Sequence, residues 1–382
     1  MTRRRPTRRG AGLLWLPLLL VNVPLGVAVA VGLMAAYLPS GPFWWAQLVA
    51  VWLPHLTWVL ALAAAFPLLA GRWGLFALHV LAIGLVVGRV EPRARLAPPP
   101  PPAPDDLRLL TFNVPEDLLE GNALGDSVVA LLREEAPHLL ALQDVYVRAG
   151  EVPAPAVQVR APTEALPYTL ALPGRLLRRP GWKDRTTGVP LLVRPDSVRV
   201  LEQEALRLGT RDDGQNSMAL RTRFEWQGRE AVLYNVHLRS FGAEKPWWDD
   251  SLRFTRPETW LPYLRRYRRV YHLRGEEVGQ LRAAMQAETA PVLLVGDFNS
   301  TADNHTYRRL RGDLQDAFRM AGGWRWGRTY HALQPFVRID FVLVDPAFEV
   351  VSARVRPVRF SDHRPVAVRL RWRDPPPDAP PG

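Results

Sequence analysis

Polar residues that follow apolar runs carry the chemistry of this sequence. The stretch "LLVGDFNST" (residues 293–301) places Asp297 and Asn299 after three aliphatic residues and a glycine. The runs "TFNV" and "ALQDV" likewise reach Asn113 and Asp144. A single Asp or Asn at a strand end is commonly a turn or a helix cap. The repetition of the pattern favours a shared site over a set of unrelated turns.

Two histidines extend this pattern. "NVHL" places His237 at a strand end, and "SDHRPV" places Asp362 and His363 at the start of another strand. Asp340 lies near the start of the strand "IDFVLV". Imidazoles can transfer protons near neutral pH. Asp340, if it lies beside His363 in space, would fix the tautomer of the ring and raise its basicity.

The residue types indicate a hard cation. The chain has no cysteine, which excludes disulfides, Cys-ligated zinc, iron–sulfur clusters and thiol nucleophiles. Carboxylates and amides suit Mg²⁺ or Mn²⁺, which proteins hold with few carboxylates plus substrate phosphate and water. Together with two imidazoles, such a site could neutralise charge, orient a water and protonate a leaving group. That combination is typical of phosphoester hydrolysis.

Alternating strands and helices must position these residues. Apolar patterning predicts strands over 107–114, 138–145, 186–194, 198–206, 337–345 and 362–372, a hairpin over 217–240, and helices over 126–137 and about 259–288. The long helix directly precedes the strand that ends in "GDFN". Residues 105–373 have a size that suits one α/β domain.

The N-terminal segment has another composition. Between residues 11 and 88 the only charged side chain is Arg72. Uncharged stretches over 12–38, 43–70 and 73–88 predict a membrane anchor over 12–90 with three transmembrane helices, the third of marginal length. The first stretch is too long for the apolar region of a signal peptide.

Arginine placement predicts the orientation of this anchor. Residues 1–11 contain five arginines and should form a basic cytoplasmic N-terminus, and Arg72 should return to that side. Three spans would put the catalytic region at the outer face of the cell membrane. Arg89, Arg93 and Arg95 oppose that arrangement, and with two spans the region would be cytoplasmic.

Two proline-rich segments flank the α/β region. Residues 91–104 form a linker with five consecutive prolines, Pro98 to Pro102, which favours a stiff polyproline II spacer. Residues 374–382, "DPPPDAPPG", have the composition of a disordered tail.

In this order, "TFNV", "ALQDV", "NVHL", "VGDFN", "IDFVLV" and "SDHRPV" resemble the endonuclease/exonuclease/phosphatase family, which has the deoxyribonuclease I-like fold. The resemblance covers nearly all of residues 105–373. "GDFN" and "SDHRPV" are specific when they occur together in this order. The resemblance implies an α/β four-layer sandwich with two central, largely antiparallel sheets and a site at one edge, here preceded by N-terminal transmembrane helices.

The resemblance also implies which residues hold a metal. Asn113 and Asp144 match metal-binding positions, and Asp362 matches a further metal contact. The family usually has Glu where this chain has Asp144. The side chain is one methylene shorter, so a cation would be held through water or would shift.

Five residues match catalytic positions of the family. Asp297 matches the residue that orients or activates the attacking water, and Asn299 the one that steadies the transition-state oxygens. His237 matches a histidine that contacts phosphate and acts as an acid. Asp340 matches the partner of His363, which contacts phosphate or acts as an acid–base group.

The substrate is less well defined by the sequence. Residues 241–275 combine Trp and Tyr with several Arg, which suits a membrane interface or an anionic headgroup, or single-stranded nucleic acid. A helix that packs its apolar face and exposes its arginines explains the same pattern. The net charge of +12 indicates an anionic partner, or a coding bias, since the excess is almost all Arg.

The sequence therefore predicts a membrane-anchored, Mg²⁺- or Mn²⁺-dependent hydrolase. Its substrate would be a phosphate ester or pyrophosphate, lipid-linked at the outer face, with the bilayer as partner and no obligate protein partner. One alternative is a metal-dependent nuclease, with nucleic acid as the partner. Another is a non-catalytic binding or resistance module on the same fold.

Overall fold

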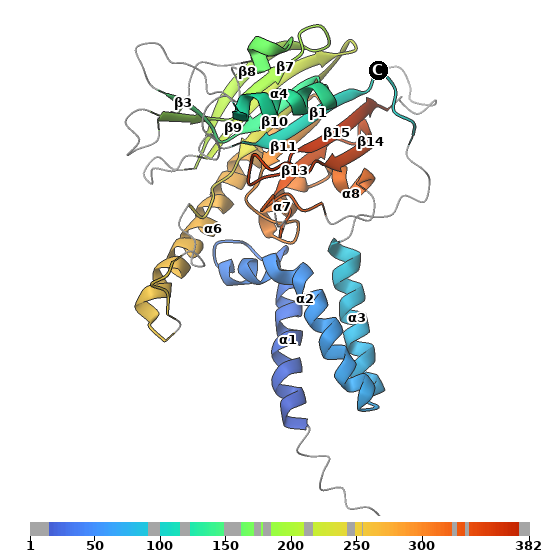
Figure 1. The fold of residues 1–382 in the computed structure, drawn as a ribbon, viewed down its shortest axis with the longest axis vertical. Coiled ribbons are helices and arrows are strands. Elements are labelled where there is room, and N and C mark those ends of the chain that lie inside the picture. Colours follow the sequence, from blue (N-terminus) through green and yellow to red (C-terminus); the bar gives the residue numbers. More distant parts are fainter. Residues whose placement is uncertain are drawn as a thin grey trace, which may run out of the picture.

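The computed structural model describes residues 15–90, 100–114, 123–148, 162–171, 177–178, 185–209, 217–242, 249–253, 255–322, 327–332 and 336–373. The predicted basic N-terminus, most of the proline-rich linker and the C-terminal tail lie outside these ranges. Two parts are visible: three N-terminal helices, and a sandwich of sheets and helices that lies at one end of them (Figure 1).

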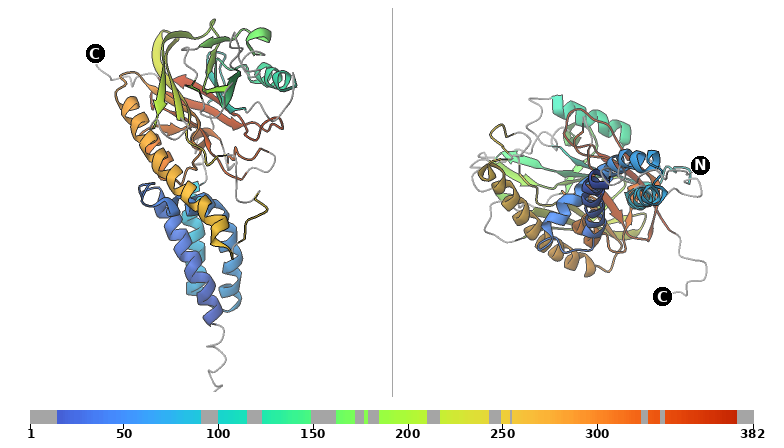
Figure 2. Two further views of the ribbon diagram at one scale, coloured as in Figure 1. Left: turned by 90° about the vertical axis from the view of Figure 1, so that its left-hand side faces the viewer. Right: turned by 90° about the horizontal axis from the view of Figure 1, so that it is seen from below.

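The N-terminal helices are α1 (Trp15–Ala35), α2 (Trp44–Leu69) and α3 (Trp73–Val90). They lie side by side, and α2 bends on its way (Figures 1 and 2). Pro54 lies inside α2, and a proline there removes one backbone hydrogen bond and kinks the helix. Among the described helices, α2 is the one long and apolar enough to cross a membrane; Leu20–Ala35 and Trp73–Arg89 are shorter apolar helices. Three spanning helices remain a prediction.

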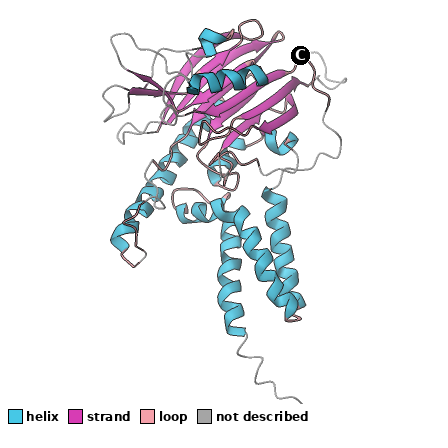
Figure 3. Cartoon of the chain, viewed as in Figure 1, coloured by secondary structure: helices cyan, strands magenta, loops and turns pink. Residues whose placement is uncertain are grey.

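Two six-stranded sheets form the centre of the sandwich (Figure 3). The first has the order β14-β15-β1-β2-β7-β4. Its strands are β1 (Leu107–Asn113), β2 (Leu139–Gln143), β4 (Thr169–Ala171), β7 (Leu191–Val193), β14 (Phe348–Val355) and β15 (Val366–Trp372). A small third sheet has the order β3-β6-β5. Its strands are β3 (Val145–Arg148), β5 (Leu177–Arg178) and β6 (Arg185–Gly188).

The second large sheet has the order β12-β13-β11-β10-β9-β8. Its strands are β8 (Arg199–Leu208), β9 (Ser217–Trp226), β10 (Arg229–His237), β11 (Val292–Asp297), β12 (Gln315–Asp316) and β13 (Asp340–Val344). The helices around the sheets are α4 (Ala123–Glu135), α6 (Pro257–Gln286), α7 (His305–Arg311) and α8 (Ala317–Ala321). Both large sheets are mixed, because β1 runs parallel to β2 and β10 parallel to β11.

Three apolar clusters define the layers. One lies between the two sheets, where Leu139 and Leu293 are fully buried. A second packs α6 and α7 on the outer face of the second sheet, with Leu281 and Leu310 buried. A third packs α4 on the first sheet through Leu132. The chain therefore forms the predicted sandwich of two sheets covered by helices.

Most of the predicted elements form close to their predicted bounds. The exception is the run over 186–194, which divides into β6 and β7 in different sheets. Pro190 stands at this division and has no N–H for a strand ladder. The strand β14 was not predicted although its eight residues carry an apolar pattern. The helices α7 and α8, with seven and five residues, are too short to show a helical repeat.

Candidate active site

Strand register brings the predicted residues to one edge of the sandwich. In the parallel pair β10–β11, His237 stands opposite Asp297. In the antiparallel pair β11–β13, Asp297 stands opposite Asp340. In the first sheet, Asn113 ends β1 beside β2. The carboxyl ends of parallel strands share an edge, so the residues that follow them meet there.

Asp297 lies at the centre of this edge and is almost fully buried. Its Oδ2 accepts a hydrogen bond from Asn113 Nδ2 at 3.0 Å. The same oxygen lies 3.6 Å from His237 Nε2 and 3.8 Å from His363 Nε2. Residues from both sheets thus converge on one carboxylate oxygen.

The backbone around Asp297 depends on Gly296 and Asn299. Gly296 has φ +128°, and a Cβ there would lie 2.0 Å from the carbonyl oxygen of Val236. Asn299 has φ +48°; its backbone N–H donates to Asp297 Oδ1 at 2.8 Å and its Nδ2 to the Leu238 carbonyl at 2.9 Å. Phe298 between them turns into the core against Phe341. Asp297 and Asn299 therefore face the site while Phe298 anchors the turn.

His363 and Asp340 form a buried pair. His363 Nδ1 lies 2.9 Å from Asp340 Oδ2 and 3.1 Å from Oδ1. Thr329 fixes the start of β13, because its Oγ1 accepts the backbone N–H of Asp340 at 3.2 Å. Nδ1 faces the carboxylate, so Nε2 is the ring nitrogen turned toward Asp297.

Burial and nearby charges shift the pKa values of His363 and Asp297. Burial alone would lower the pKa of His363, but the charges of Asp340 and Asp297 outweigh it and raise the pKa to about 10. Burial and the Asp340 charge raise the pKa of Asp297. His363 is therefore an imidazolium at neutral pH, and the acidic groups around it favour that charged form.

Sequence comparison identifies the family. Residues 110–363 match the endonuclease/exonuclease/phosphatase family, a stretch that covers more than half of the chain. This chain belongs to the endonuclease/exonuclease/phosphatase family. No protein with a curated description matches the sequence.

Solved structures resemble this chain at low sequence identity. A family protein from Leptotrichia buccalis is 15% identical with a TM-score of 0.52, and the match covers 70% of this chain and 100% of that one. A mannosyl-6-phosphatase from Bacteroides thetaiotaomicron is 19% identical with a TM-score of 0.50, over 70% and 100%. TDP2 from D. rerio, complexed with a single-stranded DNA product, is 16% identical with a TM-score of 0.48, over 70% and 99%. The likeness extends to the fold alone.

The family generally depends on a divalent metal, and the residues at this edge fit one. Asn113 Oδ1 is buried and has no hydrogen-bond partner among the described residues. Asp297, Asp340 and His363 bring ligand atoms within 4.8 Å of one another. His363 and Asp340 bind each other, so we interpret that cluster as the histidine–carboxylate pair and regard the free Asn113 oxygen as the clearer ligand. Oxygen donors suit Mg²⁺ or Mn²⁺.

The other two predicted metal ligands lie at the margin of this cluster. Asp144 follows Gln143, which is the register partner of Asn113; it is half-buried with φ +59°. Asp362 is half-buried beside His363, and its backbone oxygen accepts the N–H of Ala332. All eight predicted site residues are therefore at this edge of the sandwich, whereas their individual roles remain predictions.

Two buried amide side chains connect the two sheets behind the site. The sequence analysis gave neither of them a role. Gln143 Nε2 donates to Asn235 Oδ1 at 2.6 Å and to Thr111 Oγ1 at 3.0 Å. Asn235 Nδ2 in turn donates to the Leu142 carbonyl at 2.9 Å. Asn235 lies two residues before His237, on the same face of β10. This two-residue spacing from His237 is the sequence signal that could have placed Asn235 beside the site.

A serine supports the histidine from the first sheet. Ser361 Oγ donates to the Asn113 carbonyl at 2.8 Å and accepts the backbone N–H of His363 at 3.0 Å. Tyr330 packs its ring against the imidazole of His363, with ring centroids 4.9 Å apart. Asn113 and His363, which are far apart in the sequence, are thus held in a fixed relative position.

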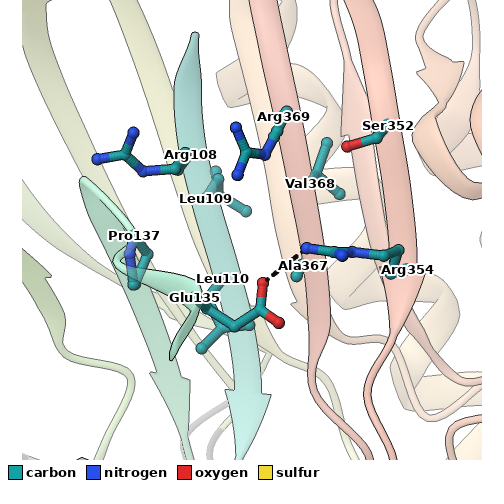
Figure 4. A pocket seen from close by; sticks show the side chains of 10 residues that line it. All are labelled: Arg108, Leu109, Leu110, Glu135, Pro137, Ser352, Arg354, Ala367, Val368 and Arg369. Atoms are coloured by element: carbon teal, nitrogen blue, oxygen red, sulfur yellow. Dashed lines mark hydrogen bonds and ion pairs between the residues drawn. The ribbon is translucent and has the colours of Figure 1, made fainter. Parts of the chain in front are cut away.

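An arginine-lined groove lies away from the site (Figure 4). Arg108 and Arg369 are register partners in β1 and β15, at the ends of these strands remote from Asn113 and His363. Arg354 there is paired with Glu135. The groove holds about 10 Å³, roughly the space of a single water. It is a basic surface rather than a ligand cavity.

Proposed function

We propose that this chain is a divalent-metal-dependent phosphoesterase held at a membrane surface. The observation that carries the proposal is the convergence of Asn113, His237 and His363 on one oxygen of the buried Asp297. A buried carboxylate between two imidazoles suits hydrolysis of a phosphate ester or pyrophosphate better than passive binding.

Asp297, His363 and His237 have different roles in the proposed hydrolysis. The oxygen of water adds to phosphorus, and the bond from phosphorus to the leaving oxygen breaks. Asp297 accepts a hydrogen bond from the attacking water, orients it and takes the proton that the water loses. His363, protonated at neutral pH because its pKa is about 10, donates a hydrogen bond to a phosphoryl oxygen. His237, half-buried at the rim, protonates the leaving oxygen.

A cation would complete this arrangement. We assign its binding to Asn113, through its unpartnered Oδ1, with Asp144 and Asp362 at the same edge. When bound, Mg²⁺ or Mn²⁺ neutralises charge on the phosphoryl oxygens. Asn299, held by its hydrogen bonds to Asp297 and Leu238, remains beside the position of those oxygens.

Three features support membrane attachment through α1–α3. The helices have 21, 26 and 18 residues, or about 32, 39 and 27 Å, which is comparable with a hydrocarbon core of about 30 Å. Large apolar side chains are exposed on them, among them Leu62 (79%) and Leu69 (87%). The sandwich and the beginning of α1 lie at opposite ends of the helices (Figure 1). With a basic cytoplasmic N-terminus, three crossings would leave the site at the outer face.

A cavity at the junction of helices and sandwich supports an anionic lipid headgroup as substrate. It holds about 860 Å³, and Trp58 of α2 lines it together with Arg328, Arg354, Arg356 and Arg364. Arg354 and Arg356 also pair with acidic residues of α4. Arg364 directly follows His363. A phosphorylated headgroup could therefore approach the site while its chains lie along the exposed surface of α2.

Turnover of three substrate classes by the full-length protein tests this proposal. Phosphatidic acid, a polyprenyl pyrophosphate and plasmid DNA would each be offered in detergent micelles with Mg²⁺ or with chelator. We expect Mg²⁺-dependent release of phosphate from a lipid substrate, absent in His363→Ala. Cleavage of DNA alone would identify a nuclease. If no substrate is turned over in a metal-dependent way and wild type equals His363→Ala, the protein is a non-catalytic binding module.

A further inference from the structure

The residues that follow Asn299 lie in direct contact with the N-terminal helices. From the contacts below, we infer that α1–α3 position the active-site segment 299–305 and are required for full turnover. Here this segment is called the catalytic loop. The inference concerns the catalytic rate and holds whether or not the helices cross a membrane, so it goes beyond the proposed function.

The first contact is a closed network of amides between α2 and the catalytic loop. Asn304 Nδ2 donates to the backbone oxygen of Gln47 at 2.9 Å, and the His305 N–H donates to Gln47 Oε1 at 3.0 Å. Gln47 Nε2 donates onward to the carbonyl oxygens of Ala35 and Leu38. Gln47 and Asn304 are both fully buried. Buried amides of this kind are costly to leave unpaired, so this contact is specific.

Asn304 also binds Thr301 within the catalytic loop and so connects the contact with α2 to that residue. Its Oδ1 accepts the backbone N–H of Thr301 at 2.8 Å and the Thr301 hydroxyl at 3.0 Å. Thr301 is two residues from Asn299, which has φ +48° and donates to Asp297. Hydrogen bonds from Asn304 to Gln47, from Thr301 to Asn304 and from Asn299 to Asp297 therefore connect α2 to the central carboxylate of the site.

The second contact is a partly buried ion pair between α3 and the catalytic loop. Arg89 Nε lies 3.0 Å from Asp303 Oδ1, and Asp303 is 3% exposed. Arg89 also donates to the Leu33 carbonyl of α1 at 2.6 Å. The guanidinium of Arg308 stacks 3.9 Å above the ring of Tyr37. Helices α2 and α3, together with Tyr37 in the turn after α1, thus contact the segment that follows Asn299.

Helix α6 holds the catalytic loop from the other side. Arg274 is fully buried and donates to Ser300 Oγ at 2.9 Å and to the Arg239 carbonyl. One residue on, the Cα of Gly275 faces Ser40 of the turn between α1 and α2, where a Cβ would lie 3.0 Å from Ser40 Oγ. The catalytic loop is therefore confined between α6 and the N-terminal helices.

Displacement of this loop should lower the rate more than the affinity for substrate. A misplacement of about 1 Å in a catalytic group can slow a reaction about 100-fold. Gln47 and Arg89 touch neither substrate nor metal in the proposed function, so they act as positioning residues. Their loss should reduce kcat and leave KM nearly unchanged.

Steady-state kinetics of full-length variants test the inference with a small soluble substrate, bis(p-nitrophenyl) phosphate. We expect Gln47→Ala to lower kcat at least about tenfold with KM within about twofold. Arg89→Ala should lower kcat while Arg89→Lys, which keeps the charge beside Asp303, restores most of it. Leu81→Ala, on the exposed surface of α3, is the matched control and should equal wild type.

Hydrogen exchange provides a readout that does not need activity. Amides of residues 300–305 should exchange faster in Gln47→Ala and Arg89→Ala than in wild type, whereas those of β9 should not change. If Gln47→Ala does not fold, the comparison of Arg89→Ala with Arg89→Lys in kcat and in hydrogen exchange tests the inference. Folded variants with wild-type kcat, or with unchanged exchange in the catalytic loop, would overturn the inference. An inactive wild type with faster exchange in both variants would instead count against the proposed function alone.

Discussion

At the scale of single residues, the site depends on a backbone position that only glycine can occupy. Gly296 lies inside β11, where its φ of +128° lies in a region that L-amino acids rarely adopt. The carbonyl of Val236 in β10 approaches it so closely that a Cβ would overlap that oxygen at 2.0 Å. This close approach sets the spacing of His237 and Asp297 across the two strands.

Gly296→Ala should therefore lower both stability and turnover. The methyl group would separate β10 from β11, and we expect a loss of at least about 2 kcal/mol in the free energy of unfolding. Gly228→Ala is the matched control. Gly228 also has a positive φ, +70°, but a Cβ there would meet nothing within 4 Å, so only the backbone strain of about 1 kcal/mol remains. Thermal unfolding of the two variants compares them, and equal losses would contradict this account of Gly296.

At the scale of elements, residues at the ends of strands could be predicted from the sequence, whereas contacts between the two sheets could not. Asn113, His237 and Asp297 were predictable because each ends an apolar run. The strand that begins near Asp340 was predicted, but its antiparallel register with Asp297 is known only from the structure. The link between Gln143 and Asn235 was not predictable, because both lie inside apolar strands and meet only when the two sheets pack. The strand β14 was missed although its apolar pattern is present in the sequence.

The pairing of β1 with β2 includes a histidine that should make stability depend on pH. His138 Nδ1 accepts the backbone N–H of Arg108 at 3.3 Å. Burial, with the charges of Arg108 and Arg194, lowers the pKa of His138 to about 4. The unfolded chain binds this proton near pH 6.5 and the folded chain only near pH 4, so stability is lost as pH falls through that range.

The expected loss from His138 between pH 6.5 and pH 4 is on the order of 3 kcal/mol. His138→Gln keeps an acceptor for the Arg108 N–H but does not titrate. Its unfolding temperature should therefore fall less steeply than that of wild type over this range. Parallel pH dependence in the two proteins would show that His138 does not contribute.

At the scale of the whole molecule, the helices and the sandwich pack directly on each other. The stiff spacer over residues 91–104 stays a prediction. Gln47, Arg89 and His55 make direct contacts with the sandwich. His55 stacks on Phe336 with ring centroids 3.8 Å apart. Gln47 and Asn304 are 257 residues apart in the chain, and no local pattern relates such residues. The sequence therefore indicated two parts but not their interface.

The most direct test of the account concerns Asp297. We predict that the full-length protein hydrolyses bis(p-nitrophenyl) phosphate with Mg²⁺, and that Asp297→Asn, which keeps the size of the side chain, lowers kcat by at least about 100-fold. Asp313→Asn, an exposed position after α7, is the matched control and should equal wild type. Mg²⁺-dependent hydrolysis that Asp297→Asn leaves unchanged in a folded protein would contradict the assignment of this edge as the active site.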